Sequence, residues 1–193
     1  MYVVFEGIDG CGKSTQIELL KPIYKDAIFT KEPGGTKFGV EAREILLHGE
    51  LKSKKAELML FLADRAEHFE EIIKPNLEKY IFSDRSFLSG IAYAITNEPS
   101  LDLEFLISLN RFVLDDTMPE KTILFKISKD ELIKRVQERG AMDKIEQRGF
   151  EYLLKIQENL FTVAKALELD YLEIDATKSI ETIHKEIVEY LQS

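Results

Sequence analysis

The sequence predicts an α/β fold in which helices cover both faces of a parallel sheet. Short apolar runs rich in β-branched and aromatic residues alternate with longer segments of helical periodicity along the whole chain. The 193 residues contain no internal repeat and no linker rich enough to separate two domains. We therefore expect a single domain over residues 1–193.

In the first part of the chain, residues 2–5 (YVVF) form a β-branched and aromatic run that predicts a buried strand. Apolar side chains at helical spacing predict a helix over residues 14–21, and Pro22 ends or kinks it. A short second strand is expected at residues 27–30. The sequence EPGGT at residues 32–36 then predicts a loop.

Helical periodicity resumes over residues 40–47 and 53–74, where Pro75 ends or kinks the second helix. A third strand at residues 80–82 leads into the sequence SDR. The remaining elements follow the same alternation. Helices are expected at 87–95, 101–114, 129–138, 150–167 and 180–191, and strands at 122–127 and 171–174. Residues 139–149 are charged and flanked by glycine, which predicts a mobile loop.

Charge and cysteine content narrow the class of protein. Lys and Arg total 26 and Asp and Glu total 35, so the formal charge of −9 argues against a protein that coats nucleic acid. A small anionic ligand remains compatible, because a local pocket can be positive. The single cysteine, Cys11, excludes an internal disulfide. The longest apolar run, residues 58–63, is too short for a transmembrane helix, and no signal peptide is expected. We expect a cytoplasmic protein with no membrane partner.

The segment GIDGCGKS at residues 7–14 fits the phosphate-binding motif G-x-x-x-x-G-K-[ST]. A predicted strand precedes it and a helix follows, as backbone cradling of phosphate requires. Lys13 would reach the β- and γ-phosphates of ATP, and the Ser14 hydroxyl would bind Mg²⁺. The residues expected to bind ATP are Gly7, Ile8, Asp9, Gly10, Cys11, Gly12, Lys13, Ser14 and Thr15. The fold is then a three-layer P-loop kinase fold.

Asp84 ends a predicted strand, where parallel sheets present ligand-binding residues. It could hold the Mg²⁺ shell, or it could cap the following helix, and the two roles are compatible. The guanine-specifying motif N-K-x-D of a GTPase is absent, and so is the dinucleotide fingerprint G-x-G-x-x-G. What remains is a small kinase for a nucleotide, a nucleoside or another metabolite.

Several blocks of sequence resemble the thymidylate kinases. They are FEGIDGCGKSTQ at residues 5–16, TKEPGGT at 30–36, FLADR at 61–65, DRS at 84–86 with Ser89 and Tyr93, and RGAMDKIE at 139–146. The blocks occur in family order and span nearly the whole chain. The resemblance implies transfer of the ATP γ-phosphoryl group to dTMP, a five-stranded parallel sheet and a homodimer.

The resemblance also implies individual roles. Phe61 would stack on thymine and Arg65 would bond its carbonyl edge, while Arg43 and Arg85 would hold the dTMP phosphate. Asp9 would meet the 3′-hydroxyl, and Ser89 and Tyr93 complete the substrate site. Arg139, in a lid at residues 139–149, would reach the transferring phosphoryl group, because Gly10 occupies the P-loop position where other members carry an arginine. The catalytic set is Lys13, Arg139, Asp84 and Asp9.

The residues alone leave other interpretations open. Phe61 fits an ordinary core position, and Arg65 fits a surface ion pair with Glu57 or Glu70. Arg43 could belong to a solvated, charged helix face. The helix at 101–114 carries an apolar stripe that packs in the core or against a second subunit.

His48, His68 and His184 are expected at surface or partly buried positions rather than in catalysis, and this expectation fits the chemistry. A phosphate monoester is mostly a dianion near pH 7 and needs no general base.

Two positions depart from the family pattern. Gly90 and Ala94 stand where the family often has polar side chains against thymine, so selection of the base must rest on Arg65, backbone groups or water. Two other functions remain as alternatives. One is a deoxynucleoside kinase that uses Asp84 or Asp9 as a base, and the other is a non-catalytic module that binds ATP.

Overall fold

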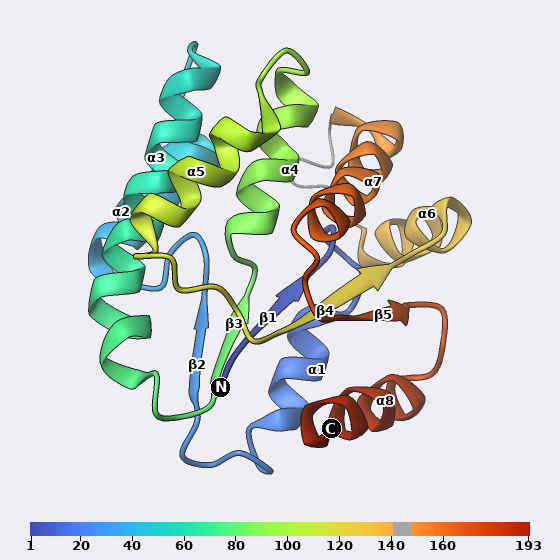
Figure 1. The fold of residues 1–193 in the computed structure, drawn as a ribbon. Helices are drawn as coiled ribbons and strands as arrows, with labels where there is room; N and C mark the ends of the chain where they lie inside the picture. The colour runs from blue at the N-terminus through green and yellow to red at the C-terminus, as the bar shows by residue number, and fades with distance from the viewer. Residues whose placement is uncertain (141–147) are drawn as a thin grey trace.

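The computed structural model describes residues 1–140 and 148–193, apart from the side chain of Arg139. Its five strands form one parallel sheet in the order β2-β3-β1-β4-β5 (Figure 1). The strands are β1 (Tyr2–Glu6), β2 (Ile28–Lys31), β3 (Ile81–Asp84), β4 (Lys121–Lys126) and β5 (Tyr171–Asp175). The predicted fold class is therefore confirmed.

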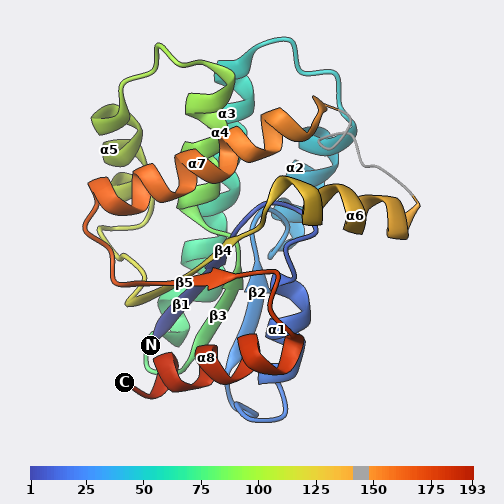
Figure 2. The same cartoon turned by 90° about the vertical axis from the view of Figure 1, so that its right-hand side faces the viewer.

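Helices lie on both faces of this sheet. They are α1 (Lys13–Leu20), α2 (Lys37–His48), α3 (Lys54–His68), α4 (Phe87–Asn97), α5 (Leu103–Val113), α6 (Lys129–Arg139), α7 (Phe150–Ala166) and α8 (Ile180–Gln192). α1 and α8 pack together on one face, and α3, α4, α5 and α7 form the layer on the other (Figures 1 and 2). A helix is present at each predicted position, and all but one match the predicted ends to within a few residues. No helix in the described part of the chain is long and apolar enough to cross a membrane.

The core is centred on the three middle strands. Every residue of β1 is buried, and the rings of Phe5, Phe82 and Phe125 meet across β3, β1 and β4. Both faces of these strands are covered, which explains why they read as continuous apolar runs rather than alternating ones. The middle strands are therefore rigid supports for the loops at their carboxyl ends.

The helix expected over residues 53–74 is divided in the structure. α3 ends at His68 and continues as a π-helical turn, Phe69–Ile73, and a 3₁₀ turn, Lys74–Asn76. Pro75 lies in the 3₁₀ turn, and its missing N–H cannot continue the α-helical bonding pattern. α2 begins earlier than expected because the Thr36 hydroxyl caps it, accepting a 2.9 Å hydrogen bond from Gly39 N.

The loops that follow β1, β2 and β3 meet at one edge of the sheet, because all the strands run in the same direction. These loops are the GIDGCGK segment, the EPGGT segment and the turn after Asp84. α6 ends nearby at Arg139. The predicted lid, residues 139–149, extends over residues 141–147, which lie outside the described residues.

Candidate active site

The loop after β1 has the backbone of a phosphate cradle. Gly10 and Gly12 adopt positive φ angles of 79° and 103°, which L residues with side chains rarely adopt. These turns bring the chain around to the N-terminus of α1, where backbone N–H groups favour an anion. Lys13 is buried and donates to the carbonyl oxygens of Gly7 and Ile8 at 3.0 and 3.2 Å. Its ammonium group therefore lies inside the loop. It would have to leave these carbonyl oxygens to bind a phosphate.

Cys11 packs inside this loop. It is buried, and a Cβ added at Gly7 would lie 2.8 Å from its Sγ atom. Burial raises the pKa of the Cys11 thiol, so the thiol stays protonated. Its contribution is to packing rather than to reactivity.

Ser14 and Asp84 come together from α1 and β3. The Ser14 hydroxyl donates to Asp84 Oδ2 at 2.9 Å, although 70 residues separate the two. Asp84 Oδ1 is buried and has no hydrogen-bond partner among the described residues. Ser86, not Asp84, is the N-cap residue of α4, so the alternative capping role is wrong. A free carboxylate oxygen beside a serine hydroxyl fits a Mg²⁺ ion, which takes oxygen ligands and few carboxylates.

Arg85 stands at the centre of the site. Its φ of 72° is strained for a residue with a side chain, and strain of this kind is typical of functional turns. Its guanidinium donates to Asp9 Oδ1 at 2.8 Å and to the Ser89 hydroxyl at 3.0 Å. Burial alone would raise the pKa of Asp9, but Arg85 and then Lys13 lower it to about 2. Asp9 is therefore ionised at neutral pH.

Glu6, to which the sequence motifs assigned no role, holds the turn at Arg85 in place. Glu6, at the end of β1, is fully buried and accepts hydrogen bonds from the backbone and hydroxyl of Ser86, both at 2.7 Å. It also accepts from the Ser89 hydroxyl at 2.5 Å. Glu6 thus fixes the start of α4 directly after Arg85, although its side chain does not line the pocket.

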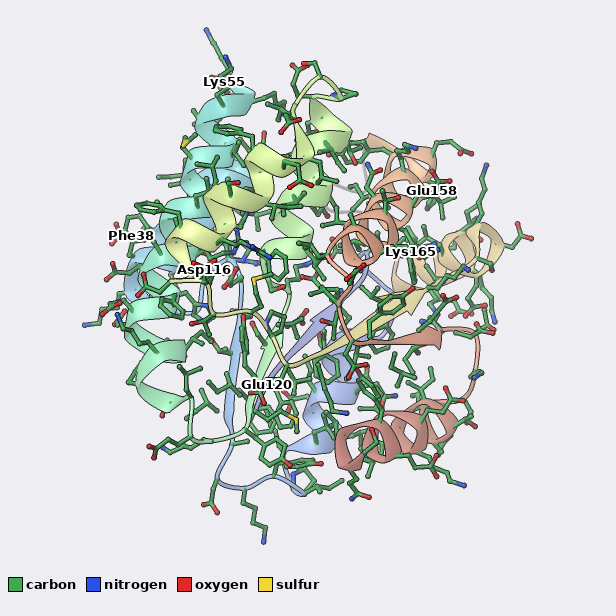
Figure 3. The ribbon with its side chains drawn as sticks, viewed as in Figure 1. Phe38, Lys55, Asp116, Glu120, Glu158 and Lys165 are labelled. Atoms are coloured by element: carbon green, nitrogen blue, oxygen red, sulfur yellow. The ribbon has the colours of Figure 1, made fainter. Side chains whose placement is uncertain are left out.

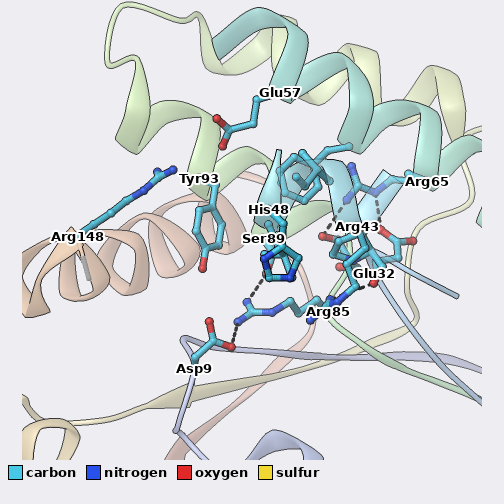
Figure 4. Close-up of a pocket in the computed structure, with 16 residues that line it drawn as sticks. Asp9, Glu32, Arg43, His48, Glu57, Arg65, Arg85, Ser89, Tyr93 and Arg148 are labelled. Atoms are coloured by element: carbon cyan, nitrogen blue, oxygen red, sulfur yellow. Dashed lines mark hydrogen bonds and ion pairs between the residues drawn. The ribbon is translucent and has the colours of Figure 1, made fainter. Parts of the chain in front are cut away.

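A deep pocket opens beside the phosphate cradle (Figure 4). It is lined by the substrate residues expected from sequence, which are Asp9, Arg43, Phe61, Arg65, Arg85, Ser89 and Tyr93. Phe61 is only partly buried and lines the pocket, so it is not simply a core residue. His48 also lines the pocket while remaining largely exposed, as expected. The cradle and the pocket share Asp9, Glu32, Arg43 and Arg85.

Arg65 is not in a surface ion pair with Glu57 or Glu70. It is 2% exposed, and its Nε donates to Glu32 Oε2 at 2.8 Å. Nη1 donates to Asn110 Oδ1 at 2.7 Å and Nη2 to the Ser86 carbonyl at 3.1 Å. The surface interpretation was wrong because the partners lie far away in sequence and could not be found at helical spacing.

His68 corrects a second expectation. Its side chain is completely buried, whereas the sequence suggested a surface or partly buried position. Nδ1 lies 2.8 Å from Glu32 Oε1, and Nε2 lies 2.6 Å from the Thr30 hydroxyl. It is shielded from the pocket and cannot act as a base on a bound ligand.

Arg43 projects from α2 toward the boundary of the two hollows. Its Nη1 donates to the carbonyl oxygen of Pro33 at 3.1 Å, in the EPGGT loop. Asp64 on α3 accepts from Gly34 N at 3.2 Å and so ties the same loop to α3. The alternative of a solvated helix face for Arg43 is therefore wrong.

Gly90 explains one departure from the family pattern. A Cβ added there would lie 3.1 Å from both terminal nitrogens of Arg65. The guanidinium of Arg65 thus packs against the bare backbone of α4. The polar group at this position comes from α3 instead of from α4 itself.

A glycine-rich phosphate cradle and a second pocket, joined by two arginines, define a P-loop enzyme that transfers a phosphoryl group between two ligands. The family model described as thymidylate kinase matches residues 5–187. The chain is 56% identical over 195 residues to a thymidylate kinase of Campylobacter hominis, with full coverage of both chains. It is 54% identical over 192 residues to one of Campylobacter concisus, covering 99% of this chain and 98% of the relative.

A solved structure agrees with these sequence matches. The crystal structure of thymidylate kinase from Ehrlichia chaffeensis superposes with a TM-score of 0.77 at 30% identity, covering 100% of this chain and 98% of that one. The chain belongs to the thymidylate kinase family, as its sequence motifs predicted. It is a nucleoside monophosphate kinase that phosphorylates dTMP. The comparisons therefore favour this function over a deoxynucleoside kinase and over a non-catalytic module that binds ATP.

Proposed function

We propose that the enzyme transfers the γ-phosphoryl group of ATP to dTMP at the boundary between the cradle and the pocket, giving dTDP and ADP. The supporting observation is that Asp9, Arg43 and Arg85 line both hollows. A donor phosphate in the cradle and an acceptor phosphate in the pocket would meet at these residues. Phosphoryl transfer depends mainly on positioning and on neutralising charge, which two arginines and a lysine supply.

On the donor side, residues 7–15 would surround the phosphates with backbone N–H groups. Lys13 would exchange the carbonyls of Gly7 and Ile8 for phosphate oxygens. Ser14 and Asp84 would hold Mg²⁺. Asp84 Oδ1, which has no hydrogen-bond partner among the described residues, supports this assignment. When bound, Mg²⁺ would neutralise phosphate charge.

On the acceptor side, Arg43 and Arg85 would hold the dTMP phosphate, and ionised Asp9 would accept a hydrogen bond from the 3′-hydroxyl. Phe61 would stack on thymine and Arg65 would donate to its carbonyl edge. Ser89 and Tyr93 would line the deoxyribose. The acceptor phosphate is mostly a dianion at neutral pH, so the chemistry requires no general base.

Arg139 is proposed to stabilise the transferring phosphoryl group from the lid. One structural observation supports this role. Arg135, one turn earlier on α6, donates to the Gly10 carbonyl at 3.1 Å and to the Ala176 carbonyl. These bonds anchor α6 beside the cradle, which supports a role there for the residue that ends the same helix.

We further propose that the chain acts as one cytoplasmic domain and assembles as a homodimer. Large apolar side chains on α2, α3 and α5 are exposed, and one surface of the molecule could bury them together. They are Phe38, Val40, Ile45, Met59, Phe105 and Phe112. The last of these is 80% exposed, unusual for a phenylalanine in a monomer. The predicted stripe on α5 is thus divided, with Leu106 in the core.

The function is tested by a coupled assay of ADP release with ATP and Mg²⁺. dTMP, dUMP, the ribose form of TMP, and thymidine are compared as acceptors, with Lys13→Ala as a control for contaminating kinases. We expect strong preference for dTMP, and loss of activity in the control. Activity with thymidine but not with dTMP would overturn the proposal. Omitting Mg²⁺ tests the metal separately.

A further inference from the structure

A cluster of buried polar side chains supports the wall of the acceptor pocket. It consists of Thr30, Glu32, Arg65, His68 and Asn110, and we call it the buried acceptor cluster. These residues come from β2, the EPGGT loop, α3 and α5. Arg65 and Glu32 line the pocket, but His68 does not. The catalytic assignments above leave His68 without a role.

Glu32 connects His68 to Arg65 through its two carboxylate oxygens. Oε1 faces His68 Nδ1 and Oε2 accepts from Arg65 Nε, each at 2.8 Å. Burial alone would raise the pKa of Glu32, but Arg65 and His68 lower it below its usual range. The carboxylate is therefore ionised, and the imidazole donates from Nδ1. Rotation of this carboxylate would break both bonds together.

Arg65 retains donors for a ligand only in one orientation. A guanidinium has five N–H groups, and Arg65 uses three of them on Glu32, Asn110 and Ser86 within the described residues. One N–H remains on each terminal nitrogen. The bond from Nε to Glu32 sets the plane of the guanidinium and hence the direction of these two donors.

Two glycines hold the cluster tightly. A Cβ added at Gly35 would lie 2.5 Å from Cδ2 of His68, so the ring edge lies against the backbone of the EPGGT loop. A Cβ added at Gly90 would lie 3.1 Å from both terminal nitrogens of Arg65. Neither the imidazole nor the guanidinium can shift toward these backbones. The orientation of Arg65 therefore depends on the bonds within the cluster.

We propose that His68 is a positioning residue for base selection, holding Glu32 so that Arg65 aims its two unused N–H groups at the carbonyl edge of thymine. The inference rests on the proposed role of Arg65. His68 touches no ligand itself, and its effect reaches the substrate through Glu32. Removing it should change which base is accepted more than it changes the transfer of phosphate.

A matched pair of variants tests this role. The side-chain nitrogen of Asn falls near the position of imidazole Nδ1, so His68→Asn keeps a donor for Glu32. Gln instead reaches the position of Nε2, so His68→Gln keeps the Thr30 contact and loses the donor for Glu32. Both are neutral amides at the same buried position, which balances their effect on stability.

The readout is the ratio of kcat/KM for dTMP to that for 5-methyl-dCMP, whose 4-amino group replaces the carbonyl that Arg65 would recognise. We expect His68→Gln to lower this ratio about tenfold, the size expected when a hydrogen bond from a charged group is weakened. His68→Asn should keep it close to that of the unmodified enzyme. Equal ratios in the two variants would overturn the proposal.

Two further variants separate the possible failures. Gln157 is buried and, among the described residues, bonds only the backbone of Ile127. Gln157→Leu therefore disturbs the core away from the pocket and should leave the ratio unchanged. Arg65→Gln should collapse the ratio. If it does not, the proposed role of Arg65 is wrong. If it does while His68→Gln keeps the ratio, only the role of His68 is refuted.

Discussion

Asp9 contributes to the free energy of unfolding by an amount that depends on pH, and replacing it by Asn is expected to remove this contribution. Asp9 accepts a 2.8 Å hydrogen bond from Arg85, and Lys13 and Arg43 add positive charge nearby. Although burial opposes ionisation, these groups lower the pKa of Asp9 from its ordinary value of 3.8 to about 2. At about 1.36 kcal/mol per pKa unit, the shift corresponds to about 2 kcal/mol. The side chain is 31% exposed, so screening by solvent makes this an upper limit.

The sign follows from the lowered pKa. The folded protein holds the Asp9 proton less tightly than the unfolded chain, so the stabilisation is complete above the unfolded pKa. It is lost as the pH falls from about 4 to about 2. Asn keeps an oxygen that accepts from Arg85 but carries no charge. The variant should therefore be less stable than the unmodified protein by at most about 2 kcal/mol at neutral pH, and this difference should nearly vanish at about pH 2.

Urea unfolding followed by circular dichroism at several pH values measures this difference directly. Other carboxylates also titrate in acid, but they are common to both proteins and cancel in the comparison. A difference that stays constant between neutral pH and about pH 2 would refute the reasoning, because the Asp9 charge would then contribute nothing to the fold. Added salt should reduce the difference at neutral pH, since the site is open to solvent.

Three other substitutions test separate parts of the site. Gly90→Ala should raise the KM for dTMP about tenfold without changing the KM for ATP, because the new Cβ displaces the Arg65 guanidinium; equal KM values for dTMP would contradict this. Arg139→Ala should lower kcat by about 10³ with little change in either KM, as measured by steady-state kinetics, and unchanged turnover would exclude the role. Phe112→Asp should convert a dimer to a monomer in size-exclusion chromatography with light scattering, and an unmodified chain that already runs as a monomer would rule out this interface.

Local patterns predicted the fold and the phosphate cradle well. The alternation of apolar runs and helical segments depends on neighbouring residues only, and the structure has all five strands and eight helices that it indicated within the described residues. The contact between Ser14 and Asp84 spans 70 residues, yet it was within reach of prediction. Strands of a parallel sheet end at a common edge, so two motifs that each follow a strand must lie close together.

The hydrogen-bond partners of the residues expected to bind substrate could not be predicted from local sequence patterns. Arg65 was matched with acids at helical spacing, while its real partners are Glu32 and Asn110, 33 and 45 residues away. His68 was expected at a surface or partly buried position, and polar residues usually lie at such positions. Its burial is possible because Thr30 and Glu32 form hydrogen bonds with both ring nitrogens. The sequence around His68 does not indicate these contacts.

Gly35 and Gly90, which pack against the buried acceptor cluster, connect these observations. At Gly90 the chain lacks the polar side chain that the family often has, which could suggest weaker recognition of the base. The space is instead filled by the Arg65 guanidinium, which lies against α4 and keeps two N–H groups for a ligand. A single rigid cation can select a carbonyl over an amino group only if it cannot rotate to avoid the wrong one. Glu32 and the His68 ring packed on Gly35 hold the guanidinium in place. We therefore expect base selectivity in this chain to depend as much on the EPGGT loop as on Arg65 itself.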